Sequence, residues 1–234
     1  MPESILIQQP SQAAQQLLVL HHGVGASAQQ LVPLGQQLAL QFPIAFIVSV
    51  HAPYASDISA SGAQWFSVQG ITDENRPERV AQAMPAFLHN LRYWQHTSGV
   101  EPGATAVLGF SQGAIMALEA AQAHAGLAGR IVALSGRYAR LPTHAPEKTT
   151  LHFIHGKSDP VIHYGHCVAA AEQLVALGAD LTADVIPYLG HDITTDVIEL
   201  VLERLTGHIP QHHWDAVLNA AAQQAASAQS GDRE

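Results

Sequence analysis

The sequence is poor in charged residues and in cysteine, and each shortage excludes a class of protein. Charged side chains make up 12% of the 234 residues, whereas apolar side chains make up 47%. Disordered chains show the opposite balance, so this composition predicts a folded globular protein. Cys167 is the single cysteine, so no disulfide can form within the chain, and a reducing compartment is compatible with that.

Positive charge is especially scarce. Lys148 and Lys157 are the only lysines, and the formal net charge is −9. Such a chain repels phosphate backbones and anionic lipids, so we expect no nucleic-acid partner. The N-terminal residues contain neither a basic start nor a long apolar run, which predicts no signal peptide, no membrane span and a cytoplasmic location.

Metal-ligand spacing is also missing, although histidine is abundant. The chain has 15 histidines, including the adjacent pairs His21-His22 and His212-His213. Neither pair has the spacing that places two imidazoles on one helix face, and no cysteine cluster supports them. We therefore expect neither a metal nor an organic cofactor.

What the sequence does contain is an alternation of apolar runs and longer amphipathic stretches. The expected strands are Leu17–His22, Ile44–Val50, Thr105–Phe110, Arg130–Gly136, Thr150–Gly156 and Thr182–Tyr188, with a further edge strand near the N-terminus. The expected helices cover about residues 27–40, 77–96, 164–177 and 193–205, and another begins at Gln112; residues 51–75 are expected to form a long loop.

This alternation predicts one α/β domain over residues 1–210, with a doubly wound, mostly parallel sheet and helices on both faces. Residues 211–234 are rich in alanine and glutamine, which predicts a C-terminal helix or a frayed tail. Only about 14 residues separate the strand that begins at Arg130 from the next strand, so no cap domain fits there.

The segment Gly109-Phe110-Ser111-Gln112-Gly113 is a G-x-S-x-G pattern between an expected strand and an expected helix. This is the context of a nucleophile elbow, in which a strained serine presents its hydroxyl at the carboxyl end of the sheet. The flanking glycines are needed because a β-carbon there would strike the neighbouring strand or helix. An ordinary strand–helix turn with a capping serine is the alternative.

A nucleophilic serine needs a base, and the base needs an orienting carboxylate, in the chain order serine, acid, histidine. Asp159 and His191 follow two later expected strands and fit this order. Taken alone, Asp159 could be a turn residue before proline, and His191 could simply begin a helix. The rival bases His163, His166, His208, His212 and His213 are placed less well, as is the rival acid Asp192.

An oxyanion hole requires two N–H donors near the serine. The N–H of Gln112, directly after the serine, is one candidate, and the glycine-rich turn His22-Gly23-Val24-Gly25 supplies the other. We assign the second donor to the N–H of Val24, with Gly23 beside it. A plain glycine-rich turn is the alternative reading.

With these residues together, the chain resembles the α/β-hydrolases, and more narrowly the phospholipase/carboxylesterase family that includes acyl-protein thioesterases. The matching segments are LHHGVGAS, GFSQGA, HGKSDPVI, GHDI and SGAQWFS, spread over about residues 17–205. The resemblance implies Ser111 as nucleophile, Asp159 as acid, His191 as base, and an oxyanion hole from the Val24 and Gln112 amides. It also implies that Trp65 and Phe66 line or flank the acyl site, although core packing of a long loop would explain them too.

The sequence therefore predicts a serine carboxylesterase that cleaves short- to medium-chain esters, or thioesters, through an acyl-serine. The substrate would be a small molecule, and the chain would be a monomer or a homodimer. Acyl-protein thioesterase or lysophospholipase activity remains open, as does a non-catalytic α/β-hydrolase scaffold that binds a small ligand.

Overall fold

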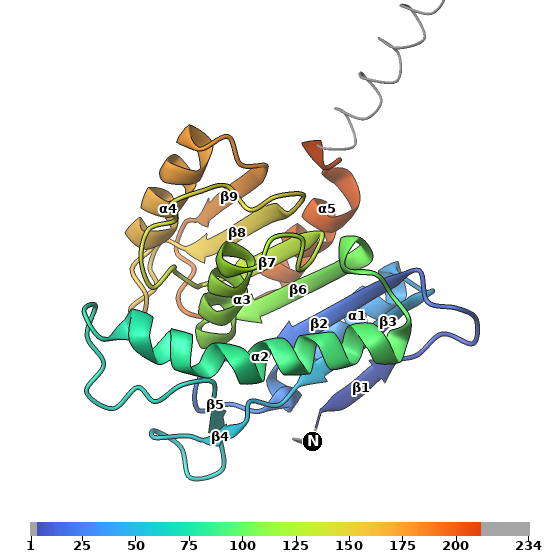
Figure 1. The fold of residues 1–234 in the computed structure, drawn as a ribbon, viewed down its shortest axis with the longest axis horizontal. Coiled ribbons are helices and arrows are strands. Elements are labelled where there is room, and N and C mark those ends of the chain that lie inside the picture. The colour runs from blue at the N-terminus through green and yellow to red at the C-terminus, as the bar shows by residue number, and fades with distance from the viewer. Residues whose placement is uncertain (1–3, 212–234) are drawn as a thin grey trace, which may run out of the picture.

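The computed structural model describes residues 4–211, which form one mixed sheet of seven strands between two layers of helices (Figure 1). The strands are β1 (Ile5–Gln8), β2 (Gln16–His21), β3 (Ala45–Val50), β6 (Thr105–Phe110), β7 (Arg130–Leu134), β8 (Thr150–Gly156) and β9 (Leu181–Ile186). Their order in the sheet is β1-β3-β2-β6-β7-β8-β9. β1 is antiparallel to β3 and the remaining neighbours are parallel, which confirms the predicted doubly wound sheet and its N-terminal edge strand.

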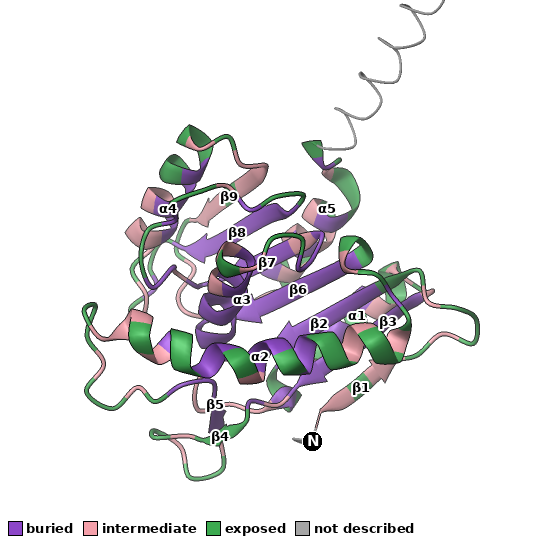
Figure 2. Cartoon of the chain, viewed as in Figure 1, coloured by how far each residue is buried: buried purple, intermediate pink, exposed green. Residues whose placement is uncertain are grey.

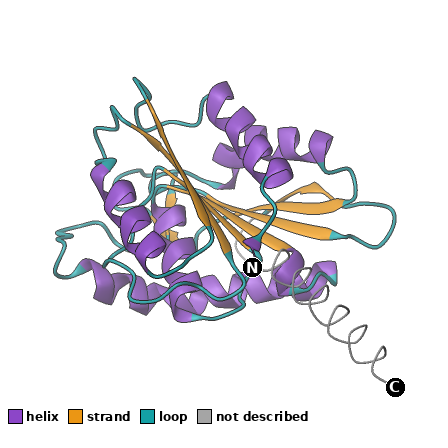
Figure 3. Cartoon of the chain, turned by 90° about the horizontal axis from the view of Figure 1, so that it is seen from above, coloured by secondary structure: helices purple, strands orange, loops and turns teal. Residues whose placement is uncertain are grey.

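Helices cover both faces of the sheet (Figure 3). They are α1 (Val32–Gln41), α2 (Arg76–Ser98), α3 (Gln112–Ala123), α4 (Gly165–Ala176) and α5 (Thr195–Gly207), with short 3-10 turns η1 (Ala28–Leu31) and η2 (Pro102–Ala104). α2, α3 and α4 share one apolar core with one face of the sheet, and α1 and α5 share a second core with the other. The central strands are buried on both sides, as Figure 2 shows, which explains their continuous apolar runs.

α2 runs unbroken through Pro85, as the sequence predicted. Pro85 and Ala81, whose carbonyl loses its helical donor, both lie on the exposed side of the helix, where water can replace the missing hydrogen bond. The helix ends at Gly99, which has a φ of 69° and closes the last turn in the left-handed conformation that glycine accepts most readily.

The loop over residues 51–75 contains structure that the sequence did not indicate. A two-residue strand β4 (Tyr54–Ala55) pairs antiparallel with β5 (Ala63–Gln64). Ala63 also bonds to the turn after β2, because its N–H donates to the carbonyl of Ala26 and its carbonyl accepts from the N–H of Gly25. This hairpin ties the loop to the glycine-rich turn at the carboxyl end of β2.

Within residues 4–211, none of the helices has the length and apolar character needed to cross a bilayer. The predicted alanine- and glutamine-rich C-terminal helix or tail lies outside the described residues, except for its first position.

Candidate active site

The turn between β6 and α3 has the strained geometry expected of a nucleophile elbow. Ser111 has a φ of 53° and a ψ of −113°, a conformation rarely adopted by residues with a side chain. Its N–H donates to the carbonyl of Leu134 on β7, and its carbonyl accepts from Ile115 one turn into α3. These two bonds hold the strained residue at the carboxyl end of the sheet.

The two glycines of the elbow are required by contacts with backbone atoms. A β-carbon at Gly113 would collide with the carbonyl oxygen of His21, and one at Gly109 would collide with the backbone of Gly113 and Ala114. These atoms belong to a strand and to the helix itself, so they cannot move aside as a flexible side chain could. The close approach of α3 to β2 therefore depends on Gly113, and its close approach to β6 depends on Gly109.

Asp159 and His191 lie in direct contact. The Nδ1–H of His191 donates to Oδ2 of Asp159 over 2.7 Å, and Oδ1 of Asp159 accepts from the N–H groups of Val161 and Ile162 at 2.8 and 2.9 Å. Burial alone would raise the pKa of Asp159, but the hydrogen bonds from His191 and from the two amides outweigh it and hold that pKa below its usual value. The carboxylate is therefore ionised and fixes the imidazole with Nε2 facing away.

His191 lies against the elbow. Its ring packs on Phe110, the residue before Ser111, with ring centroids 4.9 Å apart. Among residues 4–211, no hydrogen bond joins the Ser111 hydroxyl to the imidazole. Such contacts are often long without substrate and shorten when it binds.

A second histidine also contacts the acid. Nε2 of His155, at the end of β8, lies 3.2 Å from Oδ2 of Asp159 and 2.8 Å from the carbonyl of Ile162. Its N–H is shared between these acceptors and so ties the loop after β8 to the strand. Sequence reasoning did not identify His155, although its position in HGKSD, four residues before the acid, was a usable signal.

The turn after β2 lies against the elbow and contains one N–H group, that of Val24, without an acceptor among the described residues. Gly23 packs so closely that a β-carbon there would lie 3.2 Å from Cβ of Ser111. The N–H of Gly23 donates to the side chain of Gln30, and those of Gly25 and Ala26 donate to Ala63 and Gly23. Among residues 4–211, the N–H of Val24 and the N–H of Gln112 have no such acceptor, which leaves both available to a substrate.

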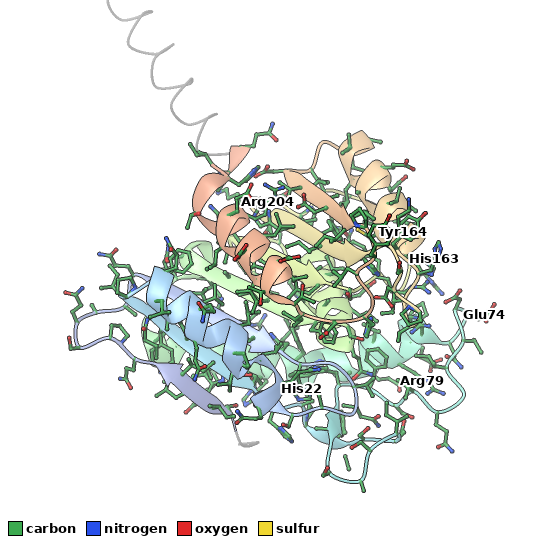
Figure 4. The ribbon with its side chains drawn as sticks, turned by 180° about the vertical axis from the view of Figure 1, so that it is seen from behind. His22, Glu74, Arg79, His163, Tyr164 and Arg204 are labelled. Carbon is green, nitrogen blue, oxygen red and sulfur yellow. The ribbon has the colours of Figure 1, made fainter. Side chains whose placement is uncertain are left out.

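His22 sets the orientation of that turn. Its Nδ1–H donates to the carbonyl of Gly23 over 2.7 Å, and its Nε2 accepts from the N–H of Ala52 over 3.0 Å. Burial lowers the pKa of His22 to about 4, so the ring is neutral. Because the carbonyl and N–H of a trans peptide point in opposite directions, fixing the Gly23 carbonyl also aims the N–H of Val24. Figure 4 shows the labelled His22 at this turn, next to the loop that contains β4 and β5.

Trp65 packs in the core, whereas the adjacent Phe66 lines the cavity that contains Ser111. Trp65 is 1% exposed, packs against His21 and Phe87, and donates its indole N–H to the carbonyl of His22. Phe66 lines a cavity of about 240 Å³ together with Ser111, Gln112 and Val24. The side chain of Gln112 holds the pair in place, because it accepts from the N–H of Trp65 and donates to the carbonyl of Phe66, both over 2.7 Å.

Cys167, by contrast, is fully buried in the core, and burial raises the pKa of its thiol to about 12. It behaves as a small apolar residue of α4 and does not line the cavity that contains Ser111.

Comparison with protein families supplies the classification. Residues 2–209 match the family model described as phospholipase/carboxylesterase. The chain belongs to the phospholipase/carboxylesterase family. Its similarity to esterase YpfH of Escherichia coli (strain K12) is 47% identity over 217 residues, which is 93% of each chain. Acyl-protein thioesterase 1 of Gibberella zeae is 29% identical over 157 residues, covering 64% of this chain and 65% of that protein.

Solved structures agree with this family. The crystal structure of esterase PE8 superposes with a TM-score of 0.79 and 27% identity, covering 87% of this chain and 96% of the other. A carboxylesterase from Mesorhizobium loti has a TM-score of 0.70 and 22% identity over 82% and 89% of the two chains, which bears on the fold alone. The protein is thus an α/β-hydrolase of the carboxylesterase/thioesterase type, a carboxylic ester hydrolase, as its sequence predicted.

Proposed function

We propose that this phospholipase/carboxylesterase-family protein is a serine hydrolase that cleaves short- to medium-chain carboxylic esters through Ser111, His191 and Asp159. The observation that carries the proposal is the 2.7 Å contact between Asp159 and His191, whose ring lies beside the elbow that holds Ser111. This is the acid–base pair that a serine hydroxyl needs in order to become a nucleophile at neutral pH.

Acylation begins when the Ser111 hydroxyl attacks the ester carbonyl and Nε2 of His191 takes its proton. Asp159, already bonded to Nδ1, keeps the ring in the correct tautomer and stabilises the imidazolium that forms. The carbonyl oxygen becomes an oxyanion, which accepts from the N–H groups of Val24 and Gln112. His191 then gives its proton to the departing alkoxide, and the alcohol leaves an acyl-serine behind.

Deacylation uses the same groups in reverse. His191 takes a proton from water, the resulting hydroxide attacks the acyl carbon, and the oxyanion again forms at the same two amides. Collapse of this intermediate breaks the bond to Ser111 Oγ, which recovers its proton from the imidazolium. The products are the free acid and the regenerated serine. Side chains, backbone amides and water account for every proton and bond in this cycle.

The size of the site supports small substrates. The cavity that contains Ser111 measures about 240 Å³, and only residues 135–149 connect β7 to β8, where larger members of the fold carry additional structure. We expect short- and medium-chain acyl esters to be cleaved faster than long-chain ones. A series of 4-nitrophenyl esters of increasing chain length measures this directly, and a preference for very long chains would contradict it.

Thioesters undergo the same chemistry and form the second candidate class. The partial similarity to an acyl-protein thioesterase favours testing them. Butyryl thioesters and butyryl oxygen esters with leaving groups of similar pKa would show which bond the site cleaves faster.

The decisive experiment is Ser111→Ala. Loss of the nucleophile should lower kcat/KM for 4-nitrophenyl butyrate by at least about four orders of magnitude. A fluorophosphonate probe should label the natural protein and leave the variant unlabelled, which separates an enzyme from a scaffold that only binds ligands. Thermal unfolding is the folding control. Activity retained within about tenfold would refute the assignment.

A further inference from the structure

Two arginine side chains lie in the cavity that contains the proposed nucleophile. Arg76 and Arg137 line it together with Ser111 and Gln112. The remaining lining residues are mostly apolar, namely Val24, Phe66, Val68, Ile71, Ile115, Val161 and Ile162, with His163 and His166 beside them. The chain has only 10 lysines and arginines and a net charge of −9, so two cations in one small apolar cavity are unexpected.

These arginines come from distant parts of the sequence and converge at the carboxyl end of the sheet. Arg76 is the first residue of α2, where the helix dipole disfavours a cation. Arg137 follows β7 after a turn in which Ser135 has a φ of 48°. Packing alone does not explain why a like-charged pair occupies these positions, because the two guanidinium groups repel each other and the start of α2 disfavours the charge of Arg76.

The charge of the pair is incompletely neutralised. The side chains of Arg76 and Arg137 are 17% and 13% exposed, and both contact one carboxylate, that of Asp73, which is 65% exposed. Nη1 of Arg137 donates to Oδ1 of Asp73 and to Nε2 of His166, which must accept and is therefore neutral. The Nε–H of Arg76 is buried and has no partner among the described residues.

Other charged or titratable groups nearby do not restore neutrality. Glu74 follows Asp73 on the exposed loop and does not line the cavity. His163 accepts from the N–H of Gly165 through its Nδ1 and brings no negative charge. Figure 4 shows the labelled His163 and Glu74 on the same side of the molecule. One exposed carboxylate thus faces two guanidinium groups.

The contacts of Asp73 indicate that a carboxylate fits between the two arginines. Its Oδ1 lies 3.0 Å from Nη1 of Arg137 and 3.6 Å from Nη2 of Arg76, so a single carboxylate oxygen lies between the two arginines. Guanidinium groups hold carboxylates through directed N–H donors, and such charge-assisted bonds are strong away from bulk water. A carboxylate on a bound substrate could take the place that Asp73 occupies from the loop.

The position of the proposed base indicates which part of the ester enters this cavity. His191 lines a separate hollow with Phe110, Asp192 and Ile193, whereas Ser111, Val24 and Gln112 line the arginine cavity. The leaving oxygen must lie next to the imidazole that protonates it. The cavity without that imidazole therefore receives the acyl chain.

We propose that Arg76 and Arg137 form a carboxylate-binding subsite, and that the preferred substrates are esters whose acyl chain ends in a carboxylate. The inference rests on the proposed serine esterase function and specifies its substrate class. Ester cleavage then releases a dicarboxylic acid, and the apolar residues between the arginines and Ser111 contact the methylene groups of the chain.

The test compares matched pairs of esters. Mono(4-nitrophenyl) adipate and 4-nitrophenyl hexanoate differ only in a terminal carboxylate in place of a methyl group, and the pimelate and heptanoate esters form a second pair with one more methylene. We expect kcat/KM to favour the acid ester in at least one pair, with a ratio that declines as NaCl is raised, because salt screens the attraction.

Variants then assign the preference to the two arginines. Arg137→Met and Arg76→Met should each lower kcat/KM for the acid ester by about 10- to 100-fold while leaving the neutral ester within about threefold. Asp73→Asn should raise the acid-to-neutral ratio severalfold, since it removes the internal competitor. Arg92→Gln, at an exposed position of α2, is the matched control and should change neither ester.

The outcomes separate this inference from the proposed function. Equal kcat/KM values within both ester pairs, or a ratio that the arginine variants leave unchanged, would overturn the subsite and leave the serine mechanism intact. Hydrolysis of the neutral esters by Ser111→Ala at a rate close to that of the natural protein would instead overturn the mechanism.

Discussion

The buried charged side chains at the two ends of the sheet differ in how completely they are paired. Near the amino ends of β7 and β9, and beside the middle of β9, partly buried charged side chains have specific partners. Arg204 donates to both carboxylate oxygens of Asp184, Arg130 donates to the carbonyls of Arg204 and His208, and His208 bonds to Asp180. At the carboxyl ends, Arg76 and Arg137 share the exposed Asp73, and the buried Nε of Arg76 has no partner.

His21, at the carboxyl end of β2, extends this contrast. It is fully buried between Trp65 and Phe87, and neither ring nitrogen makes a well-formed hydrogen bond among the described residues. Paired groups stabilise a fold, whereas a buried group without a partner lowers stability unless something else binds it. We therefore expect substitutions of paired groups at the amino ends to lower stability. At the carboxyl ends, we expect substitutions to change catalysis or, at the unpartnered His21, to remove a group that destabilises the fold in acid.

The largest effect on this comparison should come from Asp159→Asn. With the Asn oxygen held by the amides of Val161 and Ile162, its NH2 group faces Nδ1 of His191 and cannot accept the Nδ1–H. The ring would therefore adopt the wrong tautomer, and kcat should fall by about 10³- to 10⁴-fold. The Asn oxygen can still accept from the amides of Val161 and Ile162, so the fold should survive. Steady-state assays with 4-nitrophenyl butyrate measure kcat, and urea unfolding measures the stability of the fold. A loss below tenfold would show that Asp159 has no catalytic role.

The next effect concerns the orientation of the Val24 amide. His22→Gln removes the donor to the Gly23 carbonyl, whereas His22→Asn keeps a donor in the place of Nδ1. We expect the glutamine variant to lose about 10- to 100-fold in kcat with little change in KM, and the asparagine variant to retain most of its activity. Full kinetic curves for both variants provide the measurement. Equal losses in the two would mean that His22 only supports the fold.

Lowering the pH should destabilise the protein through His21, the buried histidine without a hydrogen-bond partner among the described residues. Burial, together with the neighbouring His22, lowers the pKa of His21 to about 3, and weak backbone contacts with Leu108 and Val19 offset this only in part. The unfolded chain binds a proton near pH 6.5 and the folded chain does not, so the stability present above that pH is lost as the pH falls from about 6.5 toward 3.

His21→Leu should remove this contribution, worth on the order of 2 kcal/mol at pH 5, and should flatten the dependence of the unfolding free energy on pH. Urea unfolding from pH 7.5 to 5 measures it. His22, His152 and His155 have pKa values that burial lowers in the same way, so a smaller slope should persist in the variant. An unaltered slope would contradict the role given to His21.

The smallest effect should come from the amino ends. Arg204→Met breaks the two-bond contact with Asp184 and should lower the unfolding free energy by about 1 kcal/mol, while kcat/KM for neutral esters stays within about twofold. Arg137→Met should do the reverse, altering ester preference and leaving the unfolding free energy within about 0.5 kcal/mol. If both arginines proved equally important for stability, the distinction between the two ends would fail.

Much of the architecture followed from local signals. The apolar runs predicted the strands of the main sheet, and the parallel arrangement followed from their alternation with helices. The G-x-S-x-G pattern predicted a strained serine, and Ser111 has that strain. The chain order of Ser111, Asp159 and His191, each after an expected strand, predicted that these side chains lie together at one edge of the sheet. Asp159 and His191 do lie in contact. Their catalytic roles remain a proposal.

The features that the sequence did not indicate depend on the paths of loops. β4 and β5 have two residues each, too few for any periodicity, and they exist because Ala63 bonds to the turn at Gly25 and Ala26. Arg76 and Arg137 are 61 positions apart by their numbers, and they meet because of how the loop before α2 and the turn after β7 run. Periodicity describes faces of helices and strands, so it carries no information about such meetings.

The contact of Gly113 with the His21 carbonyl has a genetic consequence. Every amino acid that one nucleotide change can produce from a glycine codon carries at least a β-carbon, and at this position that atom strikes the backbone of a central strand. A library of random single mutants selected for function should therefore contain no substitutions at position 113, even though Gly113 takes no chemical part in the reaction. The absence of tolerated substitutions two residues after the nucleophile would identify the place where the helix backbone touches the sheet.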